Sequence, residues 1–243
     1  MALEGVDTVV HLAGESLGPG RWTAGKKARI RESRIQGTKL LCQKIAQSDS
    51  PPKVLLAASG IGYYGDCGDT VVDESVPQGA GFLAELCGEW EAATRPAQEV
   101  GVRVVHLRLG IVLGEKGGAL AAMRLPFRLG LGGRLGSGQQ WMPWIGLADT
   151  VRAVDFLMTN DRAAGPVNLV SGAVRNLEFT KALGAAVKRP TLLPVPAWVL
   201  RLLLGEAADE MLLSSTRANS GRLDALGFMP HQRTLPDALS AAL

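Results

Sequence analysis

The chain has 243 residues, of which 47% are hydrophobic and 20% charged, so it is long enough for one large domain, or one domain plus a small appendage, around a sizeable core. Its net charge of +3 is too small to predict binding to nucleic acid. The three cysteines, Cys42, Cys67 and Cys87, lack the spacing of a zinc site or a disulfide framework, which favours a reducing, cytoplasmic compartment and no metal site.

No segment predicts secretion or insertion into a membrane. The first five residues, MALEG, lack the basic and apolar regions of a signal peptide. The longest apolar region, residues 192–204, contains Pro194, Pro196 and Arg201 and is too short to span a bilayer. We therefore expect no membrane partner.

Strands and helices alternate along the first half of the chain. The pattern predicts a strand at 6–14, a helix at 26–47, a strand at 53–58, a helix at 81–100 and a strand at 102–109. Strand, helix and strand thus repeat at the length of a βαβ unit. This repeat indicates an α/β fold with a Rossmann-like, doubly wound parallel sheet.

The predicted strand at 53–58 is a continuous apolar run, typical of a strand buried on both faces. It leads into a glycine-rich turn that contains Ser59, Tyr63 and Tyr64. In open α/β sheets ligands bind beyond the carboxyl ends of the strands, so we expect these three side chains at a site. The alternative is an ordinary core strand that ends in a turn.

The second half of the chain is rich in glycine and more irregular. It predicts a short helix at 120–129, an edge strand at 141–145 that contains Pro143, a helix at 149–158, a strand at 167–170, a helix at 177–187 and a helical tail. We expect a dinucleotide-binding domain over 1–165, with substrate-side insertions at about 115–146. A smaller, mixed C-terminal substrate or interaction domain is expected over 166–243.

Several motifs together resemble those of one known group of proteins. They are HLAGE at 11–15, SRIQGT at 33–38, ASGIGYYG at 58–65, LPFRLGLGG at 125–133, GSGQQWMPWI at 136–145 and LDALGF at 223–228. The chain is similar to the extended short-chain dehydrogenase/reductase superfamily, in its sugar-nucleotide-epimerase-like branch with a C-terminal domain of unknown function. The resemblance implies NAD(P)-dependent oxidoreductase or isomerase chemistry on a small or nucleotide-linked substrate.

One departure from that superfamily concerns the cofactor. Its members open with a strand and a G-x-x-G-x-x-G turn that binds the pyrophosphate, and no such turn precedes the strand at 6–14. We therefore expect an N-terminally truncated sheet and impaired binding of NADP or NAD. A first strand without one neighbour also predicts association through its free edge, with a homodimer as the expected form.

A second departure concerns the reaction. The superfamily's catalytic Tyr-x-x-x-Lys is absent, because neither Tyr63 nor Tyr64 has a lysine four residues later. By resemblance the corresponding helix places Phe82 and Leu86 at the two positions. If the protein is an enzyme, we expect Ser59 with Tyr63 or Tyr64 to carry a different reaction. The alternatives are a non-catalytic dinucleotide-binding sensor or scaffold, and an inactive truncated product.

The resemblance also assigns residues to a cofactor site. They are Leu12, Ala13, Gly14, Glu15, Arg21, Arg34, Ala58, Gly110, Ile111 and Val112. Small residues let the backbone approach a ribose and a pyrophosphate closely. For Arg34 the alternative is a solvated charge on a helix.

Four residues are predicted to contact the substrate. Arg124 and Arg128 share a helix face and suit a phosphate, although a pair of surface charges is the alternative. Gln140 and Trp144 are expected in a substrate-side loop, where an indole can stack on a base or sugar; otherwise Trp144 belongs to the core. Gly146 stands where relatives usually have histidine.

Overall fold

The computed structural model describes residues 3–18 and 20–243. Its main sheet has four parallel strands in the order β1 (Thr8–His11), β2 (Val54–Gly60), β4 (Arg103–Leu109) and β7 (Gly165–Leu169). The register places Leu55 beside Val9 and Val104. The predicted Rossmann-like parallel sheet is confirmed, with β1 at one edge.

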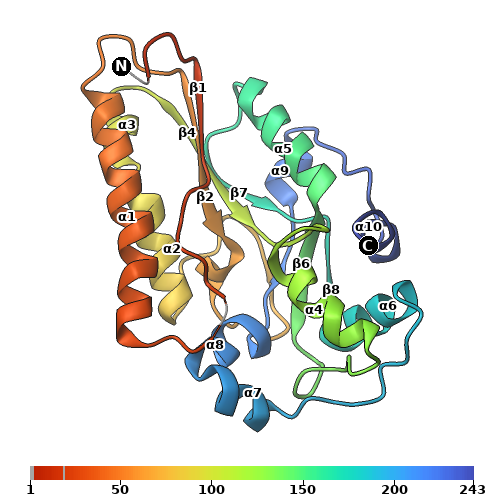
Figure 1. Ribbon diagram of the computed structural model, residues 1–243. Helices are drawn as coiled ribbons and strands as arrows, with labels where there is room; N and C mark the ends of the chain where they lie inside the picture. The colour runs from red at the N-terminus through yellow and green to blue at the C-terminus, as the bar shows by residue number, and fades with distance from the viewer. Residues whose placement is uncertain (1–2, 19) are drawn as a thin grey trace.

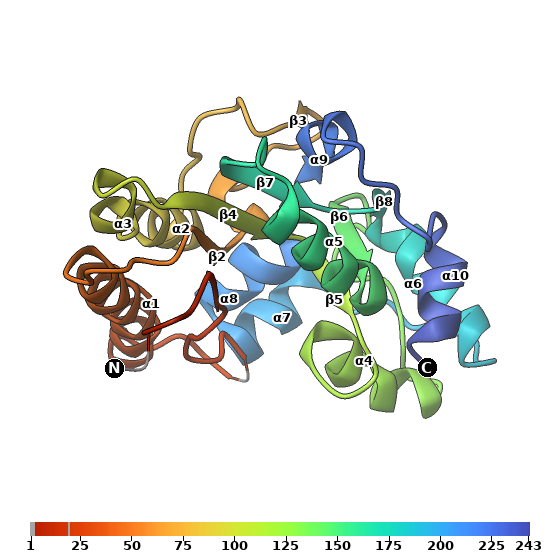
Figure 2. The same cartoon turned by 90° about the horizontal axis from the view of Figure 1, so that it is seen from above.

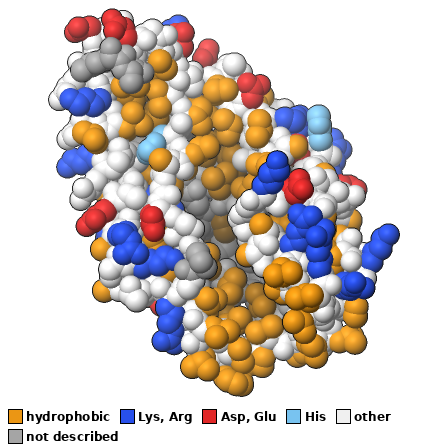
Figure 3. All heavy atoms as spheres, in the orientation of Figure 1, with side chains coloured by type: hydrophobic (Ala, Val, Ile, Leu, Met, Phe, Trp, Pro, Cys, Tyr) orange, Lys and Arg blue, Asp and Glu red, His pale blue; other side chains and the backbone are white. Residues whose placement is uncertain are grey.

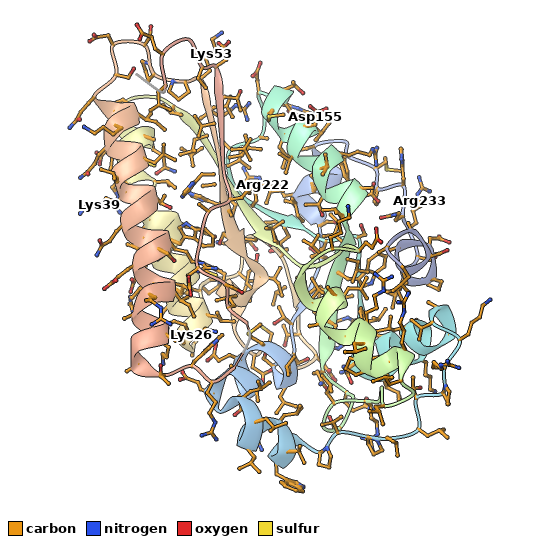
Figure 4. All side chains as sticks on the ribbon, in the orientation of Figure 1. Lys26, Lys39, Lys53, Asp155, Arg222 and Arg233 are labelled. Atoms are coloured by element: carbon orange, nitrogen blue, oxygen red, sulfur yellow. The ribbon has the colours of Figure 1, made fainter. Side chains whose placement is uncertain are left out.

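Helices cover both faces of this sheet, as the two ribbon views show (Figures 1 and 2). On one face lie α1 (Ala24–Ala46), α2 (Phe82–Ala92) and α3 (Arg95–Glu99); on the other lie α5 (Leu147–Thr159) and α9 (Gly221–Ala225). Side chains alternate along a strand, so Leu55 packs toward Ile45 of α1 while Leu56 packs in the cluster that contains Leu157 of α5. The charged side chains of Lys39 and Asp155 lie on the outer sides of these helices (Figure 4).

The helix expected at 81–100 is two helices. The α2 helix ends at Ala92, and α3 begins at Arg95 with Pro96 in its first turn. Proline has no backbone N–H, so it fits a helix start and cannot continue an existing ladder. The prediction of one helix was therefore wrong at this point.

A second sheet has three strands, in the order β5 (Ile111–Leu113), β6 (Trp141–Gly146) and β8 (Gly172–Arg175). Its middle strand is β6, so the prediction of an edge strand was wrong. Pairing with β5 begins only at Trp144, after Pro143, so the proline precedes the part of β6 that is paired on both sides.

The second sheet is packed by three helices and holds a separate part of the core. They are α4 (Gly118–Arg128), α6 (Asn176–Ala186) and α10 (Leu235–Ala241). Trp144, Phe179 and Leu239 are buried together among them. This cluster positions α4 and β6 beside the ends of the main strands (Figure 1).

The C-terminal segment returns to the first half of the chain. It contains α7 (Ala197–Leu204), α8 (Glu206–Ala208), a π-helical turn at Asp209–Leu213 and β9 (Arg217–Ala218), which pairs with β3 (Val71–Val72). Residues 166–243 thus contribute strands to all three sheets. The division at residue 165 falls at the start of β7, and a distinct C-terminal unit stays a prediction.

Within the described residues, no helix is long and apolar enough to cross a membrane, and no group of three or more potential ligands is arranged around a metal position.

Candidate functional site

A cleft of about 380 Å³ opens at the carboxyl ends of β2 and β4. Its walls come from the turn after β2, the Gly110–Ile111 segment after β4, α4, β6 and the π-helical turn; the residues that matter below are Gly62, Asp66, Leu83, Ile111, Met123, Trp141 and Glu210. Figure 3 shows a hollow lined largely by hydrophobic side chains between the β1 side and the α4 side. This is the edge at which open α/β sheets bind their ligands.

Beneath the cleft, Ser59 belongs to a buried ion-pair network. Its hydroxyl donates a hydrogen bond to Glu91 Oε1 at 2.7 Å, and the side chain is only 4% exposed. Arg108 donates from Nε and Nη2 to the two oxygens of Glu91, at 2.8 and 2.9 Å. Burial alone would lower the pKa of Arg108, but the hydrogen bonds and charge of Glu91 outweigh it and raise that pKa. The guanidinium therefore stays charged.

The two tyrosines lie against the same arginine. The Tyr64 hydroxyl accepts a hydrogen bond from Arg108 Nη1 at 2.9 Å and donates one to Asn168 Oδ1 at 2.8 Å. Burial raises the pKa of the Tyr64 phenol, so this side chain is neutral near pH 7. The Tyr63 ring is stacked on the Arg108 guanidinium, 3.5 Å from ring centroid to Cζ. Ser59, Tyr63 and Tyr64 thus gather around one ion pair, and none of the three lines the cleft.

The α2 helix presents different residues to the cleft than the resemblance assigned. Phe82 and Leu86 pack in a cluster with Trp22, away from the cleft. Leu83 lines the cleft instead. One turn later, the Cys87 sulfur lies 3.7 Å from where a Cβ on Gly60 would stand. Neither pair, at 82 and 86 or at 83 and 87, supplies a tyrosine and a lysine.

The loop after β1 carries the predicted cofactor residues Leu12, Ala13, Gly14 and Glu15, all exposed. Arg34 braces this loop, because its Nη1 donates to the Glu15 carbonyl at 2.9 Å and its Cζ would lie 3.0 Å from a Cβ on Gly14. Arg34 is 8% exposed and lies over the Trp90 ring, so the alternative of a solvated charge was wrong. Arg21 is exposed and donates to the Leu202 carbonyl, away from the loop.

The other predicted cofactor residues follow β2 and β4. Ala58 is buried within β2, whereas Gly110 and Ile111 line the cleft and Val112 is half-buried in β5. A Cβ on Gly110 would lie 2.8 Å from Val170 Cγ1 and 3.0 Å from the Pro143 carbonyl oxygen. A side chain at Gly110, which joins β4 of the main sheet to β5 of the second sheet, would therefore require Val170 or the backbone of Pro143 to shift.

The predicted substrate residues do not converge on the cleft. The α4 helix gives Ala119 and Met123 to the cleft wall, while Arg124 donates to the Leu243 carbonyl at 3.4 Å and Arg128 is exposed at the helix end. Gln140 is buried and donates to the carbonyls of Leu135 and Leu212.

Trp144 is 2% exposed and belongs to the core, whereas Trp141, on the same strand, lines the cleft. Its ring centroid lies 4.3 Å from the Cζ atoms of both Arg175 and Arg217, and its Nε1 donates to Asp69 Oδ1 at 3.1 Å. From the sequence alone, the two tryptophans could not be distinguished, because a tryptophan side chain does not show which face of its strand borders a cleft.

Four residues of the site were missed by sequence reasoning: Glu91, Arg108, Trp141 and Glu210. Arg108 could have been identified from the sequence, because it lies within the apolar strand at 102–109 and a buried charge requires a partner. Glu210 had none, because its partners are distant: its carboxylate accepts from the backbone amides of Phe82 and Leu83, each at 3.1 Å. It thereby caps the start of α2.

A Rossmann-type sheet with its cleft at the carboxyl edge is the architecture of dinucleotide-dependent enzymes and their relatives. Residues 1–170 match the family described as the NAD dependent epimerase/dehydratase family, and residues 195–242 match a domain of unknown function, DUF1731. The chain belongs to the NAD dependent epimerase/dehydratase family.

Individual relatives agree with this placement. An epimerase family protein of Mycobacterium bovis is 48% identical over 242 residues, which cover 99% of this chain and 80% of that protein. The crystal structure of human epimerase family protein SDR39U1 with NADPH matches with a TM-score of 0.94 at 34% identity, covering 99% of this chain and 82% of that one. A nucleoside-diphosphate sugar epimerase from Corynebacterium glutamicum matches with a TM-score of 0.79 at 31% identity, covering 98% of this chain and 47% of that one.

Proposed function

We propose that the protein is an NADP(H)- or NAD(H)-dependent oxidoreductase or isomerase that acts on a small or nucleotide-linked substrate without a Tyr/Lys pair. The cofactor would lie along the loop at residues 12–15 and the Gly110–Ile111 segment, and the substrate in the adjacent cleft. The observation that carries the proposal is that the loop after β1, the Gly110–Ile111 segment and the cleft all lie at the carboxyl edge of the parallel sheet.

The residues of the loop after β1 fit a dinucleotide. Ala13 and Gly14 leave the backbone open to a ligand, and Arg34 holds the loop from below through the Glu15 carbonyl. When bound, the dinucleotide would supply the hydride chemistry. The human relative holds NADPH, and nothing in the comparisons supports the expected impairment of binding.

The protein's own residues would orient the substrate rather than supply a tyrosinate. Tyr64 stays a neutral phenol because burial raises its pKa, so its role would be to hold Arg108. Ser59 would contact a substrate oxygen only by exchanging its hydrogen bond to Glu91 for one to the substrate. Tyr63 has no hydrogen bond from its hydroxyl to any described residue, and it is half-buried whereas Tyr64 is buried, so it is the more accessible phenol.

A non-catalytic dinucleotide sensor is the second candidate. One observation favours it: the α2 side chain that lines the cleft is Leu83, which cannot transfer a proton, and Cys87 one turn later is buried beside Gly60. Burial raises the pKa of the Cys87 thiol to about 11.

Calorimetric titration with NADPH and NADH tests binding first. A hydride-transfer screen with simple carbonyl compounds and UDP-sugars then tests turnover, with Ser59→Ala beside the exposed control Ser50→Ala. Turnover that falls at least about tenfold in Ser59→Ala alone supports the enzyme, since substrate-contacting groups contribute on that scale. Binding without turnover favours the sensor, and no binding of either dinucleotide would overturn both.

A further inference from the structure

We propose that the cleft takes a small, largely apolar ligand that is neutral or positively charged, and that it rejects nucleoside-diphosphate sugars. That this ligand is the substrate rests on the proposed function; the preference of the cleft itself rests on its lining. The narrower class is a neutral or cationic carbonyl compound or the matching alcohol.

The charge of the lining is the first observation. The charged side chains among the described lining residues are Asp66, Asp209 and Glu210, and no lysine or arginine accompanies them. The remaining wall is mostly apolar, with Leu109, Ile111 and similar side chains. Recognition of a diphosphate normally uses guanidinium groups, a lysine or several converging amides.

Two of the three carboxylates form no ion pair with any described lysine or arginine. Asp209 pairs with Arg201 at 2.9 Å. Asp66 instead accepts hydrogen bonds from the amides of Gly68 and Ser215, and Glu210 accepts from those of α2. Backbone amides stabilise a carboxylate by hydrogen bonds, but they carry no net charge, so the negative charge remains. The carboxylate of Glu210 also occupies the helix terminus at which an anion would otherwise bind.

Most basic residues around the cleft form ion pairs away from it; Arg217 instead stacks on Trp141 and is not itself among the lining residues. Arg175 pairs with Asp69 at 2.7 Å, and hydrogen bonds from Arg175 and Trp141, followed by the charges of Arg175 and Arg217, lower the Asp69 pKa. Lys27 and Arg31, near the start of α2, pair with Glu206 and Glu89. Arg124 and Arg128, the expected phosphate ligands, are on other faces of α4 than Met123. A diphosphate in the cleft would therefore lose water without gaining a cation.

The size of the cleft agrees with this preference. At about 380 Å³ it lies at the lower end of the range of roughly 300–1,000 Å³ for small-molecule sites. A small aromatic or aliphatic compound fits this range better than a nucleotide with an attached sugar.

Three ligands that share a benzyl group isolate the effect of charge: benzyltrimethylammonium, benzyl alcohol and benzyl phosphate, with UDP-glucose as the fourth probe. Binding to the full chain is measured by calorimetry and by Trp141 fluorescence, with Trp141→Phe to assign the signal. We expect the cation to bind at least about tenfold more tightly than the phosphate, because like charges across an interface disfavour binding. UDP-glucose should bind no better than benzyl phosphate.

The double variant Asp66→Asn/Glu210→Gln should reduce that difference to about threefold or less, while the exposed control Asp7→Asn leaves it unchanged. Asp66→Asn alone should give an intermediate difference if the double variant does not fold by circular dichroism. Tighter binding of either phosphate compound, no binding of any probe at millimolar concentration, or an unchanged order in the variants would overturn the proposal. These binding measurements contain no dinucleotide. Their outcome is therefore independent of whether the hydride-transfer screen detects turnover.

Discussion

Arg108 on β4 and Glu91 on α2 form a two-pronged ion pair directly beneath the cleft, with Arg108 3% exposed. Ser59, Tyr63 and Tyr64 each contact one of the two partners. This pair joins the helix to the sheet at the point where the candidate site residues gather, so it sets the position of all three.

Removal of one charge from this pair should strongly destabilise the fold. Glu91→Gln leaves the buried Arg108 guanidinium without its counter-charge, and we expect a loss of about 3–5 kcal/mol in the free energy of unfolding. Urea denaturation measures it, with the exposed Glu99→Gln as a control that should change stability by less than about 0.5 kcal/mol. A loss below about 1 kcal/mol in Glu91→Gln would contradict the structural role.

The buried carboxyl of Asp149 should make the stability of the fold sensitive to acid. Burial alone would raise the pKa of this fully buried carboxyl, but hydrogen bonds from the backbone of His231 and Gln232, together with Arg152, lower it. A carboxyl whose folded pKa lies below its unfolded value of about 3.9 stabilises the fold above that value. Its contribution is lost as the pH falls through the lower, folded pKa.

Stability curves from pH 7 to pH 2 should therefore decline less steeply below about pH 4 in Asp149→Asn than in the wild type. The variant should already be less stable at pH 7, by about 1–3 kcal/mol. Asp155→Asn, at an exposed position of the same helix, is the matched control. Parallel curves for Asp149→Asn and the wild type would exclude this role.

Gly146 and Gln232 should be coupled. A Cβ on Gly146 would lie 1.6 Å from Gln232 Oε1, so a side chain at this position requires the end of the Gln232 side chain to move. We expect Gly146→Ala to lose about 1–3 kcal/mol through overpacking. Adding Gln232→Ala should recover part of that loss in thermal or urea denaturation; a purely additive double variant would show that the two side chains do not compete.

The cysteines should differ in reactivity. Burial raises the pKa of the Cys42 and Cys87 thiols to about 11, while Cys67 is only half-buried, with its pKa also raised by burial and by Asp66. Since the thiolate reacts, a disulfide reagent at pH 8 should modify at most Cys67 in the folded protein, slowly, and all three after denaturation. Two rapidly reacting thiols in the native protein would be inconsistent with this burial.

The free edge of β1 predicts association. Among the described strands, β1 is paired only with β2, and Val10 and Leu12 beside it are 39% and 58% exposed. Sedimentation velocity should detect concentration-dependent self-association that Val10→Lys reduces, since an edge lysine opposes strand pairing. Lys53→Gln, at an exposed position, is the control. A monomer at all concentrations would refute the expected homodimer.

Local pattern alone determined much of this protein. The apolar run at 53–58 and the helical periodicity at 26–47 predicted β2 and α1, because burial of alternating or periodic apolar residues depends on near neighbours. The absence of a Tyr-x-x-x-Lys pair is likewise a property of the sequence. The family followed from motifs spread along the chain.

Tertiary structure decided which side chains face the cleft and which partners they meet. Residues 82 and 83 are adjacent on α2, yet Phe82 packs on Trp22 while Leu83 lines the cleft. Glu210 meets the start of α2 from 127 or more positions along the chain. Periodicity defines the faces of a helix or strand, but only the packing of distant segments determines which face borders the cleft and which charges there remain unpaired.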